Sequence, residues 1–335
     1  MSEDKQKELP NKEVREKDKS TIDQLFDDVK RYRKGSEFRK KLEFYSKFPY
    51  LGVYNAELVS QQRPGARFVL TAKNWAEKYN RKIKPNARPL IILIPFYPVE
   101  FLFDITDTKP IDNVKKADEN AIIERIIGRY MASCIHYTGY YMDYLETNLV
   151  KNGICYNNKY SAGSELLAEI REDRSELLYV QVYKDVHLPH HNYFTISVNV
   201  NVNEANELAL IFHELGHLFC HHFTCAWWEG RSCTENEKEF EAETVSYLVC
   251  ERLGIQAHSI EYLSNYLNED GLIPEISAEL VFQAVDMIQS MASGYMSIVD
   301  CLLYKKDSEF KVKVDIERER KKKEREKAKA ARASF

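Results

Sequence analysis

Two histidines four residues apart constrain this chain more than any other feature of its sequence. His213 and His217 stand in the segment ANELALIFHELGHLFCHHF, whose apolar residues recur at the spacing of an amphipathic helix. Residues four apart lie about one turn apart on the same helix face, so both imidazoles can reach one metal ion. Glu214 follows His213 directly and points to the flank, where a carboxylate can contact water without taking a ligand position. The alternative is a surface helix that carries two histidines.

A catalytic zinc ion needs a third protein ligand and one open position. The segment KEFEAETVSYLVCERLG predicts a second amphipathic helix with glutamates in its first turns. Glu239 and Glu243 are four apart and share a face, whereas Glu241 points the other way. We expect Glu239 to be the third ligand, and Glu243 to accept an imidazole N–H or to replace Glu239 as ligand. The alternative is a solvated acidic first turn that interacts with the helix dipole.

Three residues near these two helices are candidates for the walls of a cleft. His221 falls one turn beyond His217, Tyr247 falls one turn beyond Glu243, and Trp228 stands between the two helices in the sequence. Each has a simpler alternative as a helix-end histidine, a core tyrosine or a packing tryptophan.

The segment YFTISVNVNV precedes the histidine helix and alternates apolar with polar residues. This alternation predicts a half-buried strand at the edge of a sheet. Such an edge can align an extended peptide by strand addition.

Seven cysteines, an odd number without regular close spacing, do not form a disulfide framework, so we expect a reducing, cytoplasmic setting. Cys220, Cys225 and Cys233 follow the first histidine helix together with His221 and His222. They lack a Cys-x-x-Cys pair, so reduced thiols are expected there rather than a second, structural zinc site.

Composition excludes several classes of protein. Hydrophobic residues make up 44% of the 335 residues, which is enough for a buried core. No apolar run approaches the ~20 residues of a membrane helix, so no membrane partner is expected. The net charge is −4, but residues 311–332 carry +6 and the rest of the chain −10. An acidic chain binds nucleic acid only through local patches.

These patterns predict an α+β fold in four parts. A small N-terminal α+β module is joined to a mainly helical, zincin-like metallopeptidase domain with a small β-sheet. The expected boundaries are a charged N-terminal extension at 1–35, the module at 36–110, the metal domain at 111–304 and a charged, basic tail at 305–335.

The motif HELGH followed by KEFEAETVSYLVCERLGI resembles the ImmA/IrrE metallopeptidase domain, which pairs an HExxH helix with a helix carrying Glu-x-x-x-Asn or a similar pair. The resemblance implies His213, His217 and Glu239 as ligands of one zinc ion and Glu214 as the base. Glu243 stands where many members have Asn, which keeps it open as an alternative ligand.

The segment from FYSKFPY to LIILIPF is similar to the N-terminal domain of ArdC-type antirestriction proteins, which is linked to binding of single-stranded DNA. The Lys-x-Gly-x-x-Gly/Ala turn of that family is Lys84-Pro85-Asn86-Ala87 here. Basic residues interleaved with aromatic ones suit a single strand, although Trp75 is expected in the core. The candidate DNA contacts are Tyr54, Asn55, Gln61, Arg81 and Lys82.

The sequence therefore predicts a zinc-dependent metallo-endopeptidase of gluzincin type. Glu214 would activate water held by the zinc ion, and the substrate would be a protein, with a DNA-bound regulator suggested by the first resemblance. The two resemblances together suggest a bacterial or mobile-element-associated protein. The alternative is an antirestriction-type protein that binds single-stranded DNA and has a structural or vestigial metal site.

Overall fold

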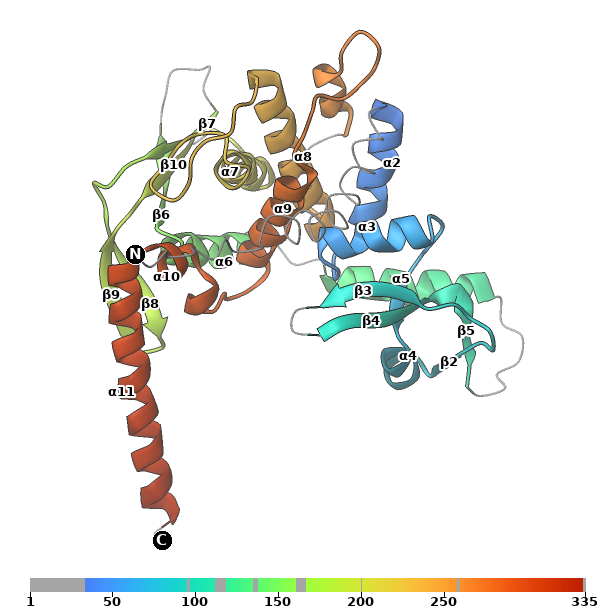
Figure 1. The fold of residues 1–335 in the computed structure, drawn as a ribbon, viewed down its shortest axis with the longest axis horizontal. Helices are drawn as coiled ribbons and strands as arrows, with labels where there is room; N and C mark the ends of the chain where they lie inside the picture. The colour runs from blue at the N-terminus through green and yellow to red at the C-terminus, as the bar shows by residue number, and fades with distance from the viewer. Residues whose placement is uncertain are drawn as a thin grey trace, which may run out of the picture.

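A computed structural model describes residues 34–94, 97–111, 119–134, 138–160, 167–199, 201–257 and 260–333. The expected N-terminal extension lies almost entirely outside the described residues. Helices and small sheets alternate along the chain (Figure 1), which confirms the α+β class.

The N-terminal part begins with two helices, α2 (Gly35–Ser46) and α3 (Val53–Gln62). A three-stranded antiparallel sheet of order β1-β4-β3 follows, beside a two-stranded sheet β2-β5 and a short helix. These elements are β1 (Val69–Thr71), α4 (Ala72–Tyr79), β2 (Arg81–Ile83), β3 (Leu90–Ile94), β4 (Tyr97–Asp104) and β5 (Thr108–Pro110). Strands β3 and β4 pair in antiparallel register. Trp75 is fully buried against Phe68, which confirms its place in the core.

The central sheet of the metal domain has the order β6-β10-β7. Strand β10 (Phe194–Asn199) pairs with β6 (Ile154–Tyr160) in parallel and with β7 (Ala168–Glu172) in antiparallel register. The prediction that this segment is an edge strand is therefore wrong. Every residue of β10 is buried, and the Thr195 hydroxyl accepts a hydrogen bond from Asn192 inside the protein. Among the described strands, β6 and β7 form the two edges of this sheet.

Helices pack on this sheet and on one another. The described helices of this part are α6 (Thr138–Lys151), α7 (Glu204–Phe219), α8 (Glu235–Leu253), α9 (Ala278–Ser293) and α10 (Leu302–Lys306). Helix α5 (Glu119–Cys134) lies beside the small sheets of the N-terminal part (Figure 1), where Ile126 and Ile127 pack against the core around Trp75. Gly254 ends α8 in the left-handed conformation at φ 71°, as its place after the last apolar residue predicts. Gly294 follows the last residue of α9.

One hydrophobic core joins the N-terminal helices to the metal domain. Phe38 of α2 packs against Phe240 of α8, with their ring centroids 5.5 Å apart. The buried guanidinium of Arg252 on α8 donates to the carbonyl oxygens of Tyr45 and Leu51, between α2 and α3. The first two helices are thus part of the wall behind the metal-site helices, whereas Phe68, Trp75 and Ile105 form a separate small core.

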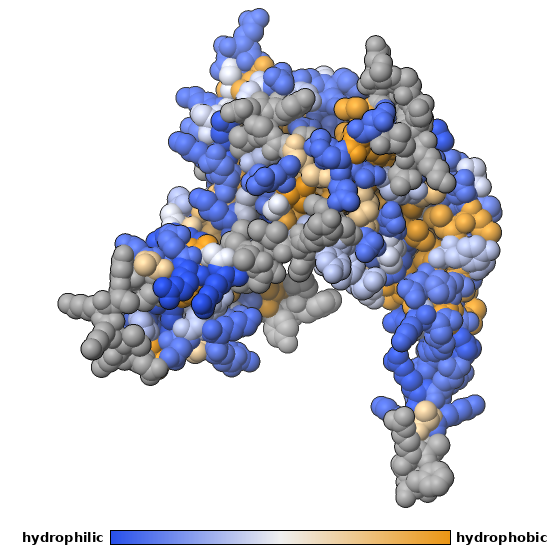
Figure 2. Space-filling view, turned by 180° about the vertical axis from the view of Figure 1, so that it is seen from behind, coloured by the Kyte–Doolittle hydropathy of each residue, from blue (hydrophilic) through white to orange (hydrophobic). Residues whose placement is uncertain are grey.

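The last long helix, α11 (Ser308–Ala333), is anchored by Phe310 and Val314, which are buried. Beyond this base it projects past the hairpin of β8 (Leu177–Tyr183) and β9 (Val186–His191), and hydrophilic side chains cover it (Figures 1 and 2). The charged tail is thus helical where it is described. Among the described residues, no helix combines the length and the apolar character needed to cross a bilayer.

Candidate metal centre

The two helices of the centre are brought together by a glycine inside the histidine motif. Helix α7 begins at its cap Asn203, and α8 begins with a capping box between Thr234 and Glu237. A Cβ atom at Gly216 would lie 3.0 Å from the backbone Cα of Ala242, so the glycine permits the close approach of α7 and α8. The Ser246 hydroxyl donates to the carbonyl oxygen of Ala209 at 2.7 Å and links the same two helices.

Three side chains converge between these helices with the geometry of a metal site. The Nε2 atoms of His213 and His217 are 3.1 Å apart, and each lies 3.4 Å from a carboxylate oxygen of Glu239. Two ligands of a tetrahedral zinc ion, each about 2.0–2.2 Å from it, are ~3.3–3.6 Å apart. The two 3.4 Å distances fall within this range and the 3.1 Å distance lies just below it, so the three residues form a candidate group for one small divalent cation.

Glu243 lies behind His213 rather than among the three ligand atoms. Its Oε2 atom is 3.2 Å from Nδ1 of His213, on the side of the ring away from His217. Burial disfavours a charged imidazole here, but hydrogen bonds to Glu239 and Glu243 outweigh it and raise the pKa of His213 to about 9. Burial and the charge of His213 lower the pKa of His217 to about 3. Glu243 thus occupies the position of an acceptor for the N–H of a ligand, one of its two expected roles.

Glu214 is buried on α7 beside the edge strand β7. Burial raises its pKa to about 7, and the charge of Glu239 adds to this effect, whereas His213 and a hydrogen bond from the backbone N–H of Ile170 oppose it. In the antiparallel ladder of β7 and β10, Leu167 is hydrogen-bonded to Asn199 and Asp173 to Tyr193. Hydrogen-bonded pairs alternate with non-bonded pairs along such a ladder, so the N–H of Ile170 points away from β10. Glu214 therefore lies on the side of β7 that faces away from β10.

A second group of possible ligands lies directly behind His217. Cys220, His222 and Glu241 are all buried, and their ligand atoms are close enough to hold an ion. The Nδ1 atoms of His217 and His222 are 2.9 Å apart, and Nε2 of His222 is 2.9 Å from Glu241 Oε2. Sequence reasoning placed Glu241 on the opposite face from Glu239, which is correct, but it did not identify the partners on that face.

The three candidate cleft residues do not gather around the ligand atoms. His221 stacks on Trp228 with ring centroids 4.4 Å apart, and Nζ of Lys306 lies 5.7 Å from the centroid of that indole. Tyr247 is buried on α8, where burial and then the charges of Glu251 and Glu43 raise its pKa to about 12. Its charged neighbours are thus on α8 and α2.

The candidate DNA contacts of the N-terminal part are mostly turned toward the protein. Asn55 donates to the carbonyl oxygen of Leu93 and accepts from its N–H, at 2.8 and 3.1 Å. Gln61 donates to Glu57 at 3.0 Å. Arg81 is buried and donates to the hydroxyl and carbonyl oxygens of Thr108.

The other two candidate contacts differ in their exposure. Tyr54 is half-buried, and Lys82 is exposed. Lys82 is therefore the one charged residue of the candidate set that faces solvent in the structure.

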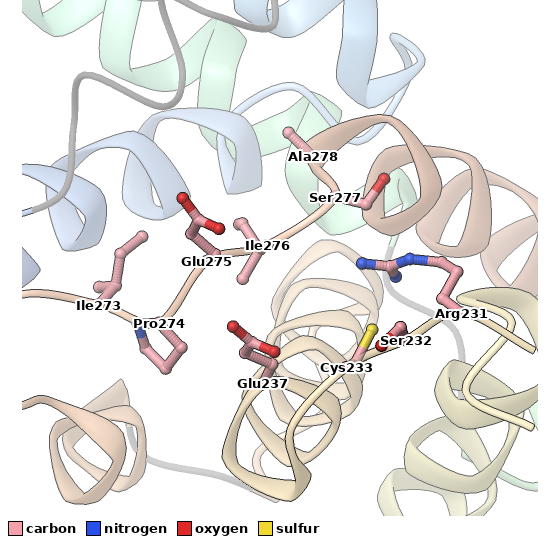
Figure 3. Close-up of a pocket in the computed structure, with 10 residues that line it drawn as sticks. All are labelled: Arg231, Ser232, Cys233, Glu237, Ile273, Pro274, Glu275, Ile276, Ser277 and Ala278. Atoms are coloured by element: carbon pink, nitrogen blue, oxygen red, sulfur yellow. The ribbon is translucent and has the colours of Figure 1, made fainter.

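A hollow of about 380 Å³ lies next to the second group, where the loop before α8 meets the segment that leads into α9. It is lined by Arg231, Ser232, Cys233, Glu237, Ile273, Pro274, Glu275, Ile276, Ser277 and Ala278. Figure 3 shows the guanidinium of Arg231 extending toward the start of α9, with Ser277 above it. Both Arg231 and Ser277 hydrogen-bond to Glu241, so this hollow lies on the other side of Glu241 from His222.

Comparisons of the chain with models of protein families, with curated proteins and with solved structures found no match.

Proposed function

We propose that this protein is a zinc-dependent peptidase whose metal ligands are His213, His217 and Glu239. The observation that carries the proposal is the convergence of their polar atoms: the two Nε2 atoms are 3.1 Å apart, and each lies 3.4 Å from one of the two Glu239 oxygens, close to the edge lengths of a tetrahedral zinc site. Two imidazoles and one carboxylate leave a fourth position open, as a catalytic site requires. A zinc ion bound there would act as a Lewis acid that polarises a substrate carbonyl and acidifies water.

The residues around the ligands suit the roles that peptide hydrolysis demands. Glu214 is next to His213 in the chain but is not one of the three grouped ligands, so its carboxylate remains available to take a proton from water. The same group would then deliver that proton to the leaving amine. Glu243 holds the Nδ1 proton of His213 and thereby directs the ring's Nε2 lone pair toward Glu239.

Strand β7 suits the binding of an extended peptide substrate. Within the described residues it pairs only with β10, and its outward backbone groups belong to Ala168, Ile170 and Glu172. A peptide added to this edge would run beside Glu214, because the N–H of Ile170 already contacts that carboxylate. The recognition edge that the sequence suggested at β10 is thus assigned to β7.

Replacing Glu214 by Gln tests the proposal against the alternative of a DNA-binding protein with a structural metal. The variant should keep its zinc, because Glu214 is not a ligand, and should lose about 10²–10⁴-fold in hydrolysis. A proteome-derived peptide mixture analysed by mass spectrometry provides the substrate and reports new chain ends. Hydrolysis that persists unchanged in Glu214→Gln, or wild-type protein that cleaves nothing while holding zinc, would contradict the proposal.

A further inference from the structure

The side chains behind His217 form a continuous chain that ends on an arginine. His217 contacts His222, His222 contacts Glu241, and both carboxylate oxygens of Glu241 accept from Arg231, at 2.7 and 3.1 Å. The backbone N–H of Ser277 adds a further bond to Glu241 Oε1 at 2.6 Å. The side chains of His222 and Glu241 are at most 1% exposed.

The donors and acceptors of this chain can be assigned from one end to the other. Glu241 is ionised beside Arg231 and can only accept, so Nε2 of His222 must donate to it. A neutral His222 then has a lone pair at Nδ1, which can only accept a hydrogen bond from the Nδ1–H of His217. His217 is left with its lone pair at Nε2, facing His213 and Glu239.

We propose that His222 is a positioning residue that fixes the metal-binding tautomer of His217, and that Cys220, His222 and Glu241 do not hold a second metal ion. The inference rests on the proposed metal centre. With this assignment, each of the two histidine ligands has a hydrogen-bonding partner at its Nδ1 atom. Glu243 contacts His213 directly, whereas Glu241 acts on His217 through His222.

The surroundings of Glu241 argue against a metal ion in the second group. Its two oxygens already receive four hydrogen bonds, from His222, Arg231 and Ser277, and the guanidinium brings a positive charge to the place a cation would need. Full burial also raises the pKa of the Cys220 thiol well above its ordinary value, which disfavours the thiolate that binds metals.

The backbone after α7 is shaped to place His222 under His217. His221 has a left-handed conformation at φ 58°, which costs a residue other than glycine about 1 kcal/mol or more. This bend lets the N–H of His222 donate to the carbonyl oxygen of His217 at 3.1 Å. Arg231 closes the turn from the other side, because its N–H donates to the carbonyl oxygen of His221 and its guanidinium to that of Cys220.

Two substitutions at one position test the inference. In His222→Gln the amide oxygen can accept from His217 while the amide nitrogen donates to Glu241, so the order of donor and acceptor is kept. In His222→Leu both are lost. We expect zinc affinity, measured by competition with a chelator, to fall about 10–100-fold in His222→Leu and to stay within about threefold of wild type in His222→Gln.

Cys220→Ala provides a matched control at the neighbouring buried position. It removes a ligand of the second group but leaves the carbonyl oxygen that Arg231 uses, so we expect one zinc per chain with unchanged affinity. Far-UV circular dichroism shows whether each variant is folded.

The outcomes separate this inference from the proposed function. Two zinc ions per wild-type chain, with one lost in Cys220→Ala, would overturn the inference but leave the peptidase proposal standing. Equal zinc affinity in His222→Leu and wild type would also overturn the inference and leave the peptidase proposal standing. A wild-type protein that binds no zinc, or binds it equally well after His213→Ala, would overturn both.

Discussion

The metal centre and the N-terminal module both contain polar residues that the sequence marks as candidates, but the structure uses them differently. At the centre, His213, His217 and Glu239 turn their polar atoms toward one point. In the module, Asn55 and Arg81 turn theirs toward the protein's own backbone. Spacing on a helix fixes the relative directions of side chains, whereas residue type and order alone do not.

The largest effect is expected from the third ligand. Glu239→Ala should lower zinc affinity by at least about 100-fold, whereas Glu243→Ala, which removes only the acceptor behind His213, should lower it about 10-fold. Competition with a chelator measures both. Glu235→Ala, at an exposed position of the same helix, serves as the control and should leave affinity unchanged. A greater loss in Glu243→Ala than in Glu239→Ala would reverse the two assigned roles.

The packing of α7 on α8 should be the next most sensitive feature. Gly216→Ala places a methyl group 3.0 Å from the backbone of Ala242, so we expect about 1–3 kcal/mol of destabilisation in urea unfolding, together with weaker zinc binding. Gly65→Ala is the matched control, because nothing lies within 4 Å of its Cβ position. Equal stability of the two variants would show that the helices do not approach each other as described.

Two neighbouring basic residues of the module differ in burial: Arg81 is buried and Lys82 is exposed. Arg81→Ala removes a buried guanidinium and leaves Thr108 without its donor, so stability should fall by about 1–3 kcal/mol. Lys82→Ala, at an exposed position, should change stability by about 0.5 kcal/mol or less.

Anisotropy of a labelled oligothymidylate tests DNA binding by the same two variants. If the alternative function holds and Lys82 contacts the strand, Lys82→Ala weakens binding without loss of stability. A loss of binding in folded Arg81→Ala alone would contradict the structural role assigned to Arg81.

A smaller loss of stability than in Arg81→Ala is expected at the edge of the β1-β4-β3 sheet. The side-chain amides of Asn55 and Gln62 pair with the backbone of Leu93 and Ile91, so α3 covers the edge of β3. Replacing both by Ala should cost about 1–2 kcal/mol and should increase self-association, since exposed strand edges recruit other strands. Sedimentation velocity measures the association. A double variant with the association state and the stability of the wild type would remove this role.

The helices were the most predictable part of the molecule, because their apolar periodicity and end signals are local. Asn203, Thr234 and Gly254 stand at the ends of α7 and α8 as such residues should. Strand β10 was placed at the wrong position in the sheet. Its alternation predicts solvent on one side, but the polar residues on that side are buried, and Thr195 accepts a hydrogen bond from Asn192.

The candidate ligands were predictable because four-residue spacing on two helices leaves few relative arrangements. The contacts of His222 and Glu241 behind His217 were not predictable from the sequence. They depend on a bend at His221 and on Arg231, which approaches from a loop. The one available signal was a second histidine pair, His221 and His222, directly after the motif. For the module, no local pattern distinguishes an amide that binds a ligand from one that covers a sheet edge.

Anomalous diffraction at the zinc edge, from crystals of the zinc-loaded protein, tests the central claim most directly. The account predicts one peak per chain, about 2.0–2.2 Å from Nε2 of His213, Nε2 of His217 and a carboxylate oxygen of Glu239. No peak at that point, or a peak among Cys220, His222 and Glu241 instead, would contradict it.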